Sequence, residues 1–318
     1  MKIVVSVNPG EEILAQWQAA HPEVKFALAT EPAAQVDEVE GADAYIGRID
    51  REAFLGAGPR LRWVHSNGAG IETMAAIPEL VASDVTVTNT RGGHAPAIAE
   101  HMFGLLLALT RRLPDHLEDQ REHRWPARGR LATMRELTGA TMVVVGMGNI
   151  GRAIAKRAVA FEMRVLGVDI KPGPAPDGVE AIWPLDRLDE ALRQAEVLVI
   201  ATPQTAETRG MIDARRIRLL PQDAYLVVVS RGRIVDEPAL IAALQSGKLA
   251  GAGLDVTATE PLPADNPLWD APNLLITPHC SAASRQTSER VWDITTENIR
   301  RFVAGEPLTN VCDIRAGF

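Results

Sequence analysis

The sequence predicts an α/β protein with two domains, each built around a parallel, doubly wound sheet. Short apolar runs alternate with amphipathic stretches along most of the chain, which is the pattern of repeated strand–helix units. The chain has 318 residues, more than one hydrophobic core usually holds. A glycine-rich turn connects one of the apolar runs directly to a helical stretch.

The first series of strands and helices occupies the first third of the chain. We expect strands at Lys2–Val7, Val24–Ala29, Ala42–Ile46, Leu61–His65 and Val85–Thr88, with helices that include Glu11–Ala20 and Arg51–Ala57. From His94 to Thr110, apolar residues recur at three- and four-residue spacing, which predicts a long helix that could link the two domains. The charged segment Arg111–Arg135 is expected to be a surface helix followed by a loop.

A second series begins at residue 141. We expect strands at Thr141–Val145, Met163–Val168, Glu196–Ile200, Ala224–Val229, Ala250–Leu254 and Leu274–Ile276. The expected helices are Ile150–Ala160, Asp186–Gln194, Glu237–Ser246 and a last amphipathic helix, Ser284–Ala304.

The glycine-rich turn has the pattern of a dinucleotide-binding loop. Gly146, Gly148 and Gly151 form a G-x-G-x-x-G motif between a β-branched strand and a helix, and Asp169 follows eighteen residues after Gly151. Glycines here permit a tight turn, a close approach of the pyrophosphate and close helix packing. Asp169 can accept hydrogen bonds from the ribose hydroxyls, and its charge would repel a 2′-phosphate. The motif therefore predicts a Rossmann-like domain that prefers NAD to NADP, although nearby Lys171 could weaken this preference.

Three polar segments follow later strands, where open α/β sheets bind their ligands. They are residues 230–236, 254–262 and 277–281. Reduction of a 2-oxo acid needs a cation for the carboxylate, a proton donor for the carbonyl oxygen and a hydride. Arg231 can bind a carboxylate through two hydrogen bonds from its planar guanidinium group. His279 can supply the proton because histidine titrates near neutral pH. Glu260 can hydrogen-bond the other ring nitrogen of His279.

Composition limits the classes of partner. The net charge is −8 and no basic stripe is present, which argues against nucleic acid. No apolar run reaches the length of a membrane span, and the start of the chain reads as a strand, not a signal peptide. The two cysteines, Cys280 and Cys312, form no disulfide or metal motif, so we expect no metal and a cytoplasmic location.

Taken together, these motifs resemble the D-isomer-specific 2-hydroxyacid dehydrogenase family. The resemblance rests on Trp63–Ile71, Asn89–Thr90, Ala99–His101, Gly146–Gly151, Thr202–Gly210, Ser230–Glu237, Gly253–Leu262 and Thr277–Ser281. It covers most of the chain from residue 60 onward. It implies two Rossmann-like domains with the active site in a cleft between them. Residues 1–89 and 284–318 would form a flavodoxin-like substrate domain, and residues 90–283 the NAD-binding domain.

The resemblance also implies roles for individual residues. Arg231, Glu260 and His279 would be the catalytic trio, and Asn67, Gly68 and Ala69 would help Arg231 hold the substrate carboxylate. With the glycine motif, the expected cofactor contacts are Gly146, Gly148, Asn149, Ile150, Gly151, Asp169, Thr202, Val229, Ser230, Asp255 and Ser281. A homodimer and D-stereochemistry are implied in the same way.

Two other functions remain open at this point. The first is a regulatory protein of corepressor type that binds the dinucleotide but catalyses no turnover. The second is an oxidoreductase that acts on formate or phosphite. Formate needs no protonated carbonyl, so the pair of Glu260 and His279 favours a 2-oxo acid. The sequence does not name the acid.

Overall fold

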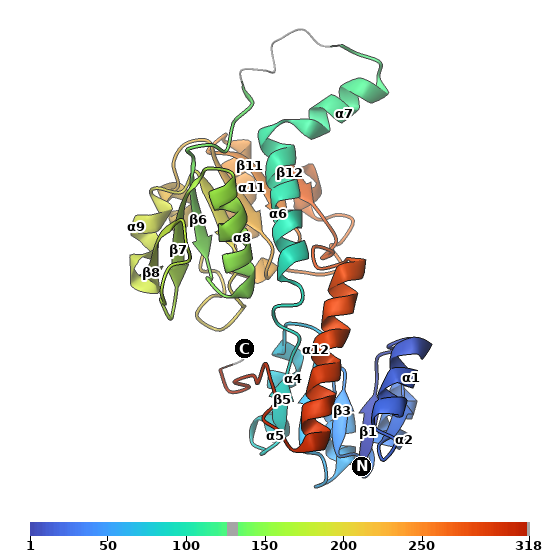
Figure 1. Ribbon diagram of the computed structural model, residues 1–318. Helices are drawn as coiled ribbons and strands as arrows, with labels where there is room; N and C mark the ends of the chain where they lie inside the picture. The colour runs from blue at the N-terminus through green and yellow to red at the C-terminus, as the bar shows by residue number, and fades with distance from the viewer. Residues whose placement is uncertain (126–132, 317–318) are drawn as a thin grey trace. The chain divides into compact units, whose positions relative to one another are not determined.

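The computed structural model describes residues 1–125 and 133–316, which divide into two compact units. Unit 1 comprises Met1–His94 and Ser284–Phe318, and unit 2 comprises Ala95–Ala283. Each unit contains one parallel sheet with helices on its faces (Figure 1). The expected fold class, α/β with two Rossmann-type domains and parallel doubly wound sheets, is confirmed.

Unit 1 has a five-stranded sheet in the order β2-β1-β3-β4-β5, which is the flavodoxin-like order. The strands are β1 (Lys2–Val5), β2 (Lys25–Leu28), β3 (Ala44–Ile46), β4 (Trp63–His65) and β5 (Thr86–Thr88). The helices are α1 (Glu11–Ala20), α2 (Pro32–Val39), α3 (Arg51–Ala57), α4 (Glu72–Ala75), α5 (Pro78–Val81) and α12 (Arg285–Ala304).

Side chains alternate between the two faces along these strands, so unit 1 has a hydrophobic core on each face of its sheet. Val4, Tyr45 and Val64 are buried in one hydrophobic cluster, whereas Ile3 and Trp63 are buried in the other. Successive side chains of a strand point to opposite faces, so neighbouring residues enter different cores. Helix α12 contributes Ile299 to the second core, although it follows unit 2 in the chain.

Unit 2 has a seven-stranded sheet in the order β12-β11-β10-β9-β6-β7-β8. The strands are β6 (Thr141–Val145), β7 (Arg164–Asp169), β8 (Val179–Pro184), β9 (Val197–Ile200), β10 (Ala224–Val228), β11 (Leu249–Leu254) and β12 (Leu274–Ile276). The strand order reverses between β6 and β9, where open α/β sheets form their ligand-binding crevice.

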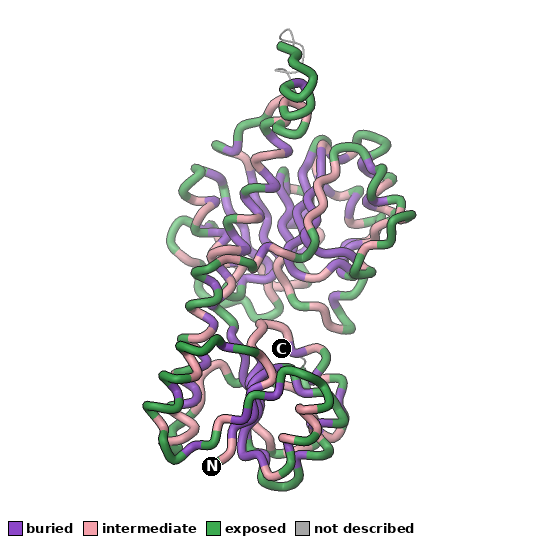
Figure 2. The backbone as a smooth tube through the Cα atoms, turned by 90° about the vertical axis from the view of Figure 1, so that its right-hand side faces the viewer, coloured by how far each residue is buried: buried purple, intermediate pink, exposed green. Residues whose placement is uncertain are grey.

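Helices cover both faces of the unit 2 sheet, and the central strands between them are buried (Figures 1 and 2). Helices α6 (Ala95–Thr110) and α8 (Asn149–Ala160) pack on one face. Helices α9 (Leu188–Leu192), α10 (Ala214–Leu219) and α11 (Glu237–Gln245) pack on the other. Short 3₁₀ helices are Leu185–Arg187, Gly232–Ile234 and Pro267–Asp270, and α7 (Leu113–Arg121) follows α6.

Most expected elements are found within a few residues of their expected limits, with a few additions. Strand β8 and helices α2, α4, α5 and α10 were not expected. Strand β8 is a partly exposed edge strand that ends in proline, so its apolar pattern is weak. The expected surface segment 111–135 contains α7, and its residues 126–132 lie outside the described part. Within the described residues, no helix combines the length and apolar character needed to span a membrane.

Candidate active site

The glycine-rich loop follows β6, and its backbone requires glycine at residues 146 and 151. Gly146 has φ +94°, and a Cβ at this position would lie 2.6 Å from the backbone nitrogen of Thr202. A Cβ on Gly151 would lie 1.9 Å from the carbonyl oxygen of Gly146. A Cβ on Gly148 would meet nothing within 4 Å, so open space faces this residue. Helix α8 begins directly afterwards at Asn149 and Ile150 with its free N–H groups.

Asp169 lies at the end of β7 and holds the glycine-rich loop. Its Oδ2 accepts a hydrogen bond from the Met147 backbone N–H at 2.7 Å, and its Oδ1 accepts one from Lys171 N–H at 2.9 Å. Each carboxylate oxygen can accept a second hydrogen bond. Asp169 can therefore stabilise the loop and still accept from ribose hydroxyls.

An unsatisfied hydroxyl lies at the same edge of the sheet. Ser230 Oγ is buried and has no hydrogen-bond partner among the described residues. Val229 and Ser230 directly follow β10, and Thr202 follows β9. A buried hydroxyl normally has a partner. The orphaned Ser230 hydroxyl, the open space at Gly148 and the free helix N-terminus fit a bound dinucleotide.

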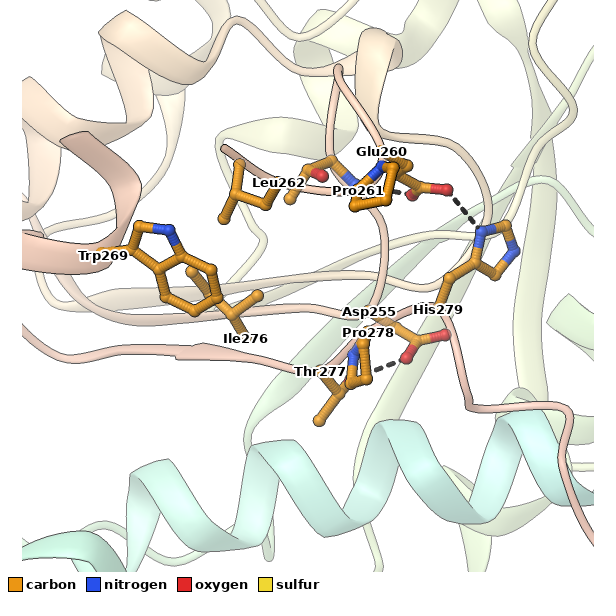
Figure 3. A pocket seen from close by; sticks show the side chains of 10 residues that line it. Asp255, Glu260, Pro261, Leu262, Trp269, Ile276, Thr277, Pro278 and His279 are labelled. Atoms are coloured by element: carbon orange, nitrogen blue, oxygen red, sulfur yellow. Dashed lines mark hydrogen bonds and ion pairs between the residues drawn. The ribbon is translucent and has the colours of Figure 1, made fainter. Parts of the chain in front are cut away.

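His279 and Glu260 form a hydrogen-bonded pair in unit 2. The His279 Nδ1 atom lies 2.7 Å from Glu260 Oε2, and both side chains are partly exposed (Figure 3). The other carboxylate oxygen of Glu260 accepts a hydrogen bond from the Thr257 backbone N–H at 3.0 Å. The carboxylate is therefore fixed at both oxygens and orients the imidazole, so that Nε2 is the ring nitrogen left to exchange a proton.

Arg231 is placed by a close contact between two loops. A Cβ on Gly232 would lie 2.0 Å from the Thr257 carbonyl carbon, so only glycine lets the loop after β10 reach the loop after β11. The next residue, Arg233, donates a hydrogen bond to Ala258 O at 2.9 Å. Arg231 therefore lies in a loop that packs directly against the loop of Glu260, and one of its own hydrogen bonds goes to Ser230 O at 2.7 Å.

A buried carboxylate holds the turn that carries His279. The fully buried Asp255 side chain accepts hydrogen bonds from Thr277 Oγ1 at 2.6 Å and from the backbone N–H groups of Cys280 at 2.9 Å and Ser281 at 3.0 Å. The His279 N–H donates to the Asp255 carbonyl oxygen at 2.8 Å. His279 has φ +52°, a left-handed conformation that these bonds hold in place. We call residues 255 and 277–281 the Asp255 clamp.

The sequence assigned no individual role in this network to His101 or Thr277. His101 on α6 lies with Nε2 2.8 Å from Thr277 Oγ1, and Thr277 joins it to Asp255. Asp255 and Ser281 were expected to contact the cofactor, and the structure places both within the Asp255 clamp. No spacing rule connects residues 101, 255 and 277, so the sequence alone carried no signal for their contact.

A pocket of about 600 Å³ opens beside His279 and Glu260. Its other lining residues are Asp255, Thr257, Pro261, Leu262, Trp269, Ile276, Thr277 and Pro278. Figure 3 shows Trp269, Leu262 and Ile276 on one side of the pocket and the pair of His279 and Glu260 on the other. The pocket thus offers an apolar wall opposite the hydrogen-bonded pair of His279 and Glu260.

The expected substrate-carboxylate residues lie in unit 1, after β4. The Gly68 N–H donates to Ser66 Oγ at 3.2 Å, and the Gly68 carbonyl accepts from Thr90 N–H at 3.2 Å. Asn89 Nδ2 donates to Ala69 O at 2.6 Å. These bonds fix the loop that contains Asn67, Gly68 and Ala69, which lie in a different unit from His279.

Comparisons with known proteins decide the family. The family model described as "D-isomer specific 2-hydroxyacid dehydrogenase, NAD binding domain" matches residues 103–281. A glyoxylate reductase of Korarchaeum cryptofilum is 35% identical over 280 residues, which cover 85% of this chain and 82% of that protein. The chain belongs to the D-isomer-specific 2-hydroxyacid dehydrogenase family.

Solved structures of this dehydrogenase family share the fold. A D-isomer-specific 2-hydroxyacid dehydrogenase of Xanthobacter autotrophicus, in complex with NADPH, is 32% identical, with a TM-score of 0.81, and the match covers 100% of this chain and 99% of that chain. A D-lactate dehydrogenase of Aquifex aeolicus, in complex with NAD and lactic acid, is 26% identical, with a TM-score of 0.78, and 96% of each chain is covered.

As a 2-hydroxyacid dehydrogenase, the protein is an oxidoreductase that interconverts hydroxy acids and oxo acids with a nicotinamide dinucleotide. The expected enzyme class is therefore confirmed. Because the two structures above hold NAD and NADPH, the choice between these dinucleotides depends on residues of this chain.

Proposed function

We propose that the protein reduces a small 2-oxo acid to the D-2-hydroxy acid with NADH. The observation that carries this proposal is the contact of His279 Nδ1 with Glu260 at 2.7 Å beside a pocket of about 600 Å³. This pair supplies a proton donor of the kind that carbonyl reduction requires. Neither formate oxidation nor simple dinucleotide binding needs such a donor.

Each proposed residue has one chemical task. Arg231 binds the substrate carboxylate through its guanidinium, and the loop at Asn67, Gly68 and Ala69 supplies further carboxylate contacts. His279 donates the proton on Nε2 to the carbonyl oxygen, while Glu260 stabilises the ring through Nδ1. The bound dinucleotide supplies the hydride. In the reverse direction, His279 Nε2 accepts the hydroxyl proton.

We propose NAD as the preferred cofactor because of Asp169. The carboxylate follows β7 and touches the glycine-rich loop, so it lies where the adenosine ribose is held in this fold. A 2′-phosphate next to this carboxylate would experience like-charge repulsion. The residues that would hold NAD are the eleven cofactor contacts named from the sequence, among which Asp255 and Ser281 also form the turn at His279.

We propose a cytoplasmic homodimer whose substrate is a small 2-oxo or 2-hydroxy acid. Helix α7 supports association because Leu113 and Leu117 expose 47% and 54% of their surface. The two cysteines of the chain are both free thiols, which suits a reducing compartment. Light scattering coupled to gel filtration tests the dimer, and a monomer at micromolar concentration would contradict it.

The test of function is NADH oxidation against a panel of 2-oxo acids, with NADPH measured in parallel. We expect turnover with at least one acid and a higher kcat/KM for NADH than for NADPH. Turnover of formate or phosphite with NAD, in place of any 2-oxo acid, would contradict the proposal. Tight NADH binding with no turnover on any substrate would favour the regulatory alternative.

The His279→Ala variant tests the proton donor. We expect kcat to fall by roughly 10²- to 10⁴-fold because general acid catalysis is lost. The NADH dissociation constant, measured by fluorescence, should stay within about twofold because the exposed imidazole is not needed for the glycine-rich loop. Loss of both turnover and NADH binding would instead identify His279 as a structural residue.

A further inference from the structure

Three metal-binding side chains of different types meet beneath the turn that carries His279. A ring nitrogen of His101, a carboxylate oxygen of Asp255 and Cys280 Sγ all lie within 4.8 Å of one another. They come from α6, the end of β11 and the segment after β12, which are all parts of unit 2. No sequence motif joins them, which is why the sequence predicted no metal.

Their separations are close to those of ligands on one ion. Tetrahedral zinc with bonds of about 2.0–2.3 Å keeps its donor atoms about 3.3–3.8 Å apart. His101 Nε2 and Asp255 Oδ1 are already 3.6 Å apart. The remaining pairs, within 4.8 Å, need a contraction of about 1 Å, which rotation of the Cys280 side chain can supply.

The chemistry of the donors favours a thiophilic divalent cation. A thiolate and an imidazole favour zinc over magnesium or calcium, which prefer all-oxygen sites. The Asp255 carboxylate and the Cys280 thiolate together carry a charge of −2, and a neutral His101 adds none. With a divalent cation bound, the largely buried site would therefore be neutral. Burial and the neighbouring Asp255 raise the pKa of the Cys280 thiol, so a bound ion must displace its proton.

One further group faces the site. The Thr277 hydroxyl donates to Asp255 Oδ1 at 2.6 Å, and its oxygen lies 2.8 Å from His101 Nε2. It therefore bridges two of the three donors. An ion could replace this bridge or take the hydroxyl oxygen as a neutral fourth ligand. Asp255 and Thr277 also line the pocket beside His279, so the cluster adjoins this pocket (Figure 3).

We propose that His101, Asp255 and Cys280 form an inhibitory site for Zn²⁺. Binding releases the thiol proton to solvent and forms one bond from the ion to each donor, with no change of oxidation state. The ion withdraws Asp255 Oδ1 from the Cys280 N–H and from Thr277, which are two of the contacts of the Asp255 clamp. The inhibition rests on the proposed function, whereas the binding does not.

Binding is tested with Co²⁺ as a spectroscopic probe on chelator-treated protein. We expect one equivalent to bind, with a thiolate-to-cobalt charge-transfer band in the near ultraviolet. Cys280→Ala should lose this band and weaken binding at least about tenfold. The matched control is Cys312→Ala, which removes the other thiol, a buried one in unit 1, and should leave the band unchanged. A band that survives in Cys280→Ala, or no charge-transfer band in the wild type, would overturn the proposal.

Inhibition is then measured as the Zn²⁺ concentration that halves each variant's own rate of NADH oxidation. Cys280→Ala and His101→Gln should each raise this concentration at least about tenfold, and Cys312→Ala should not. Equal inhibition of all four proteins would overturn the inhibitory role. A wild type that binds Co²⁺ through the thiolate but turns over no 2-oxo acid would overturn the proposed function and leave the metal site standing.

Discussion

At the scale of single residues, Asp169 has a structural role, and the proposed preference for NAD gives it a selective one as well. Its two oxygens accept the backbone N–H groups of Met147 and Lys171, so the carboxylate fixes the glycine-rich loop. The same charge would disfavour a 2′-phosphate. In this proposal, one side chain both fixes the shape of the loop and selects the dinucleotide.

Replacement of Asp169 by alanine should shift the cofactor preference. We expect the ratio of kcat/KM for NADPH to kcat/KM for NADH to rise at least about tenfold. The reason is that the variant no longer repels the 2′-phosphate of NADPH. A tenfold change in this ratio corresponds to about 1.4 kcal/mol. The control is Asp177→Ala, which removes the same charge from an exposed position in the following loop. An unchanged ratio in the Asp169 variant, or an equal change in both, would show that Asp169 does not select the cofactor.

At the scale of elements, the turn after β12 depends on its neighbour β11. Asp255 at the end of β11 binds the hydroxyl of Thr277 and two backbone N–H groups of the turn. The left-handed residue His279 lies between these contacts. The position of the His279 ring is therefore set by the register of two adjacent parallel strands, in which Leu254 pairs with Ile276.

Thr277→Val tests this dependence. We expect kcat to fall about tenfold with a smaller change in KM, because the hydroxyl bond from Thr277 to Asp255 is lost and the His279 turn loosens. Loss of this bond should lower the free energy of unfolding by about 1–3 kcal/mol. Thr277→Ser, which keeps the hydroxyl, should restore the rate. If Thr277→Val keeps the wild-type kcat and pH profile, the clamp does not position His279.

The elements that could be predicted from the sequence are those with strong local signals. The β-branched run Val143–Val145 and the glycines after it predicted β6, the loop and α8, because a positive φ at Gly146 is a local requirement. The contact of Glu260 with His279 agrees with the expected pairing, although their roles stay predictions. The link from His101 through Thr277 to Asp255 could not be predicted, because side-chain contacts across 176 and 22 residues leave no periodic pattern.

At the scale of the molecule, a buried histidine couples stability to pH. His65 on β4 forms a hydrogen bond with each of its ring nitrogens. Its Nδ1 lies 2.7 Å from Thr88 Oγ1, and its Nε2 lies 2.9 Å from Thr295 Oγ1 on α12. It thereby joins the sheet of unit 1 to its C-terminal helix. Burial lowers the pKa of His65 to about 3, so the folded protein keeps the ring neutral.

We expect unit 1 to lose stability in mild acid. The unfolded chain binds a proton at His65 near pH 6.5 and the folded chain only near pH 3, so the stability is full above pH 6.5 and is lost as the pH falls toward 3. Between about pH 7.5 and 5 this group alone should account for about 2 kcal/mol. Urea unfolding at both pH values measures this loss in the free energy of unfolding. The His65→Gln variant should show a smaller loss. The control variant His123→Gln, which changes an exposed histidine, should show the same loss as the wild type. Identical pH dependence in wild type and His65→Gln would contradict this role.

The division of unit 1 into two chain segments has a consequence for how the protein is made. Trp17 near the start of the chain donates a hydrogen bond to Thr296 at 2.7 Å, and one of the two cores of unit 1 includes Ile299 and Leu308. During translation, Thr296, Ile299 and Leu308 are synthesised only after all of unit 2. The core of the N-terminal segment therefore stays incomplete until the end of synthesis. Unit 2, which is one continuous segment, can fold before unit 1. Chaperone demand during translation should accordingly concentrate on the segment Met1–His94, which precedes unit 2.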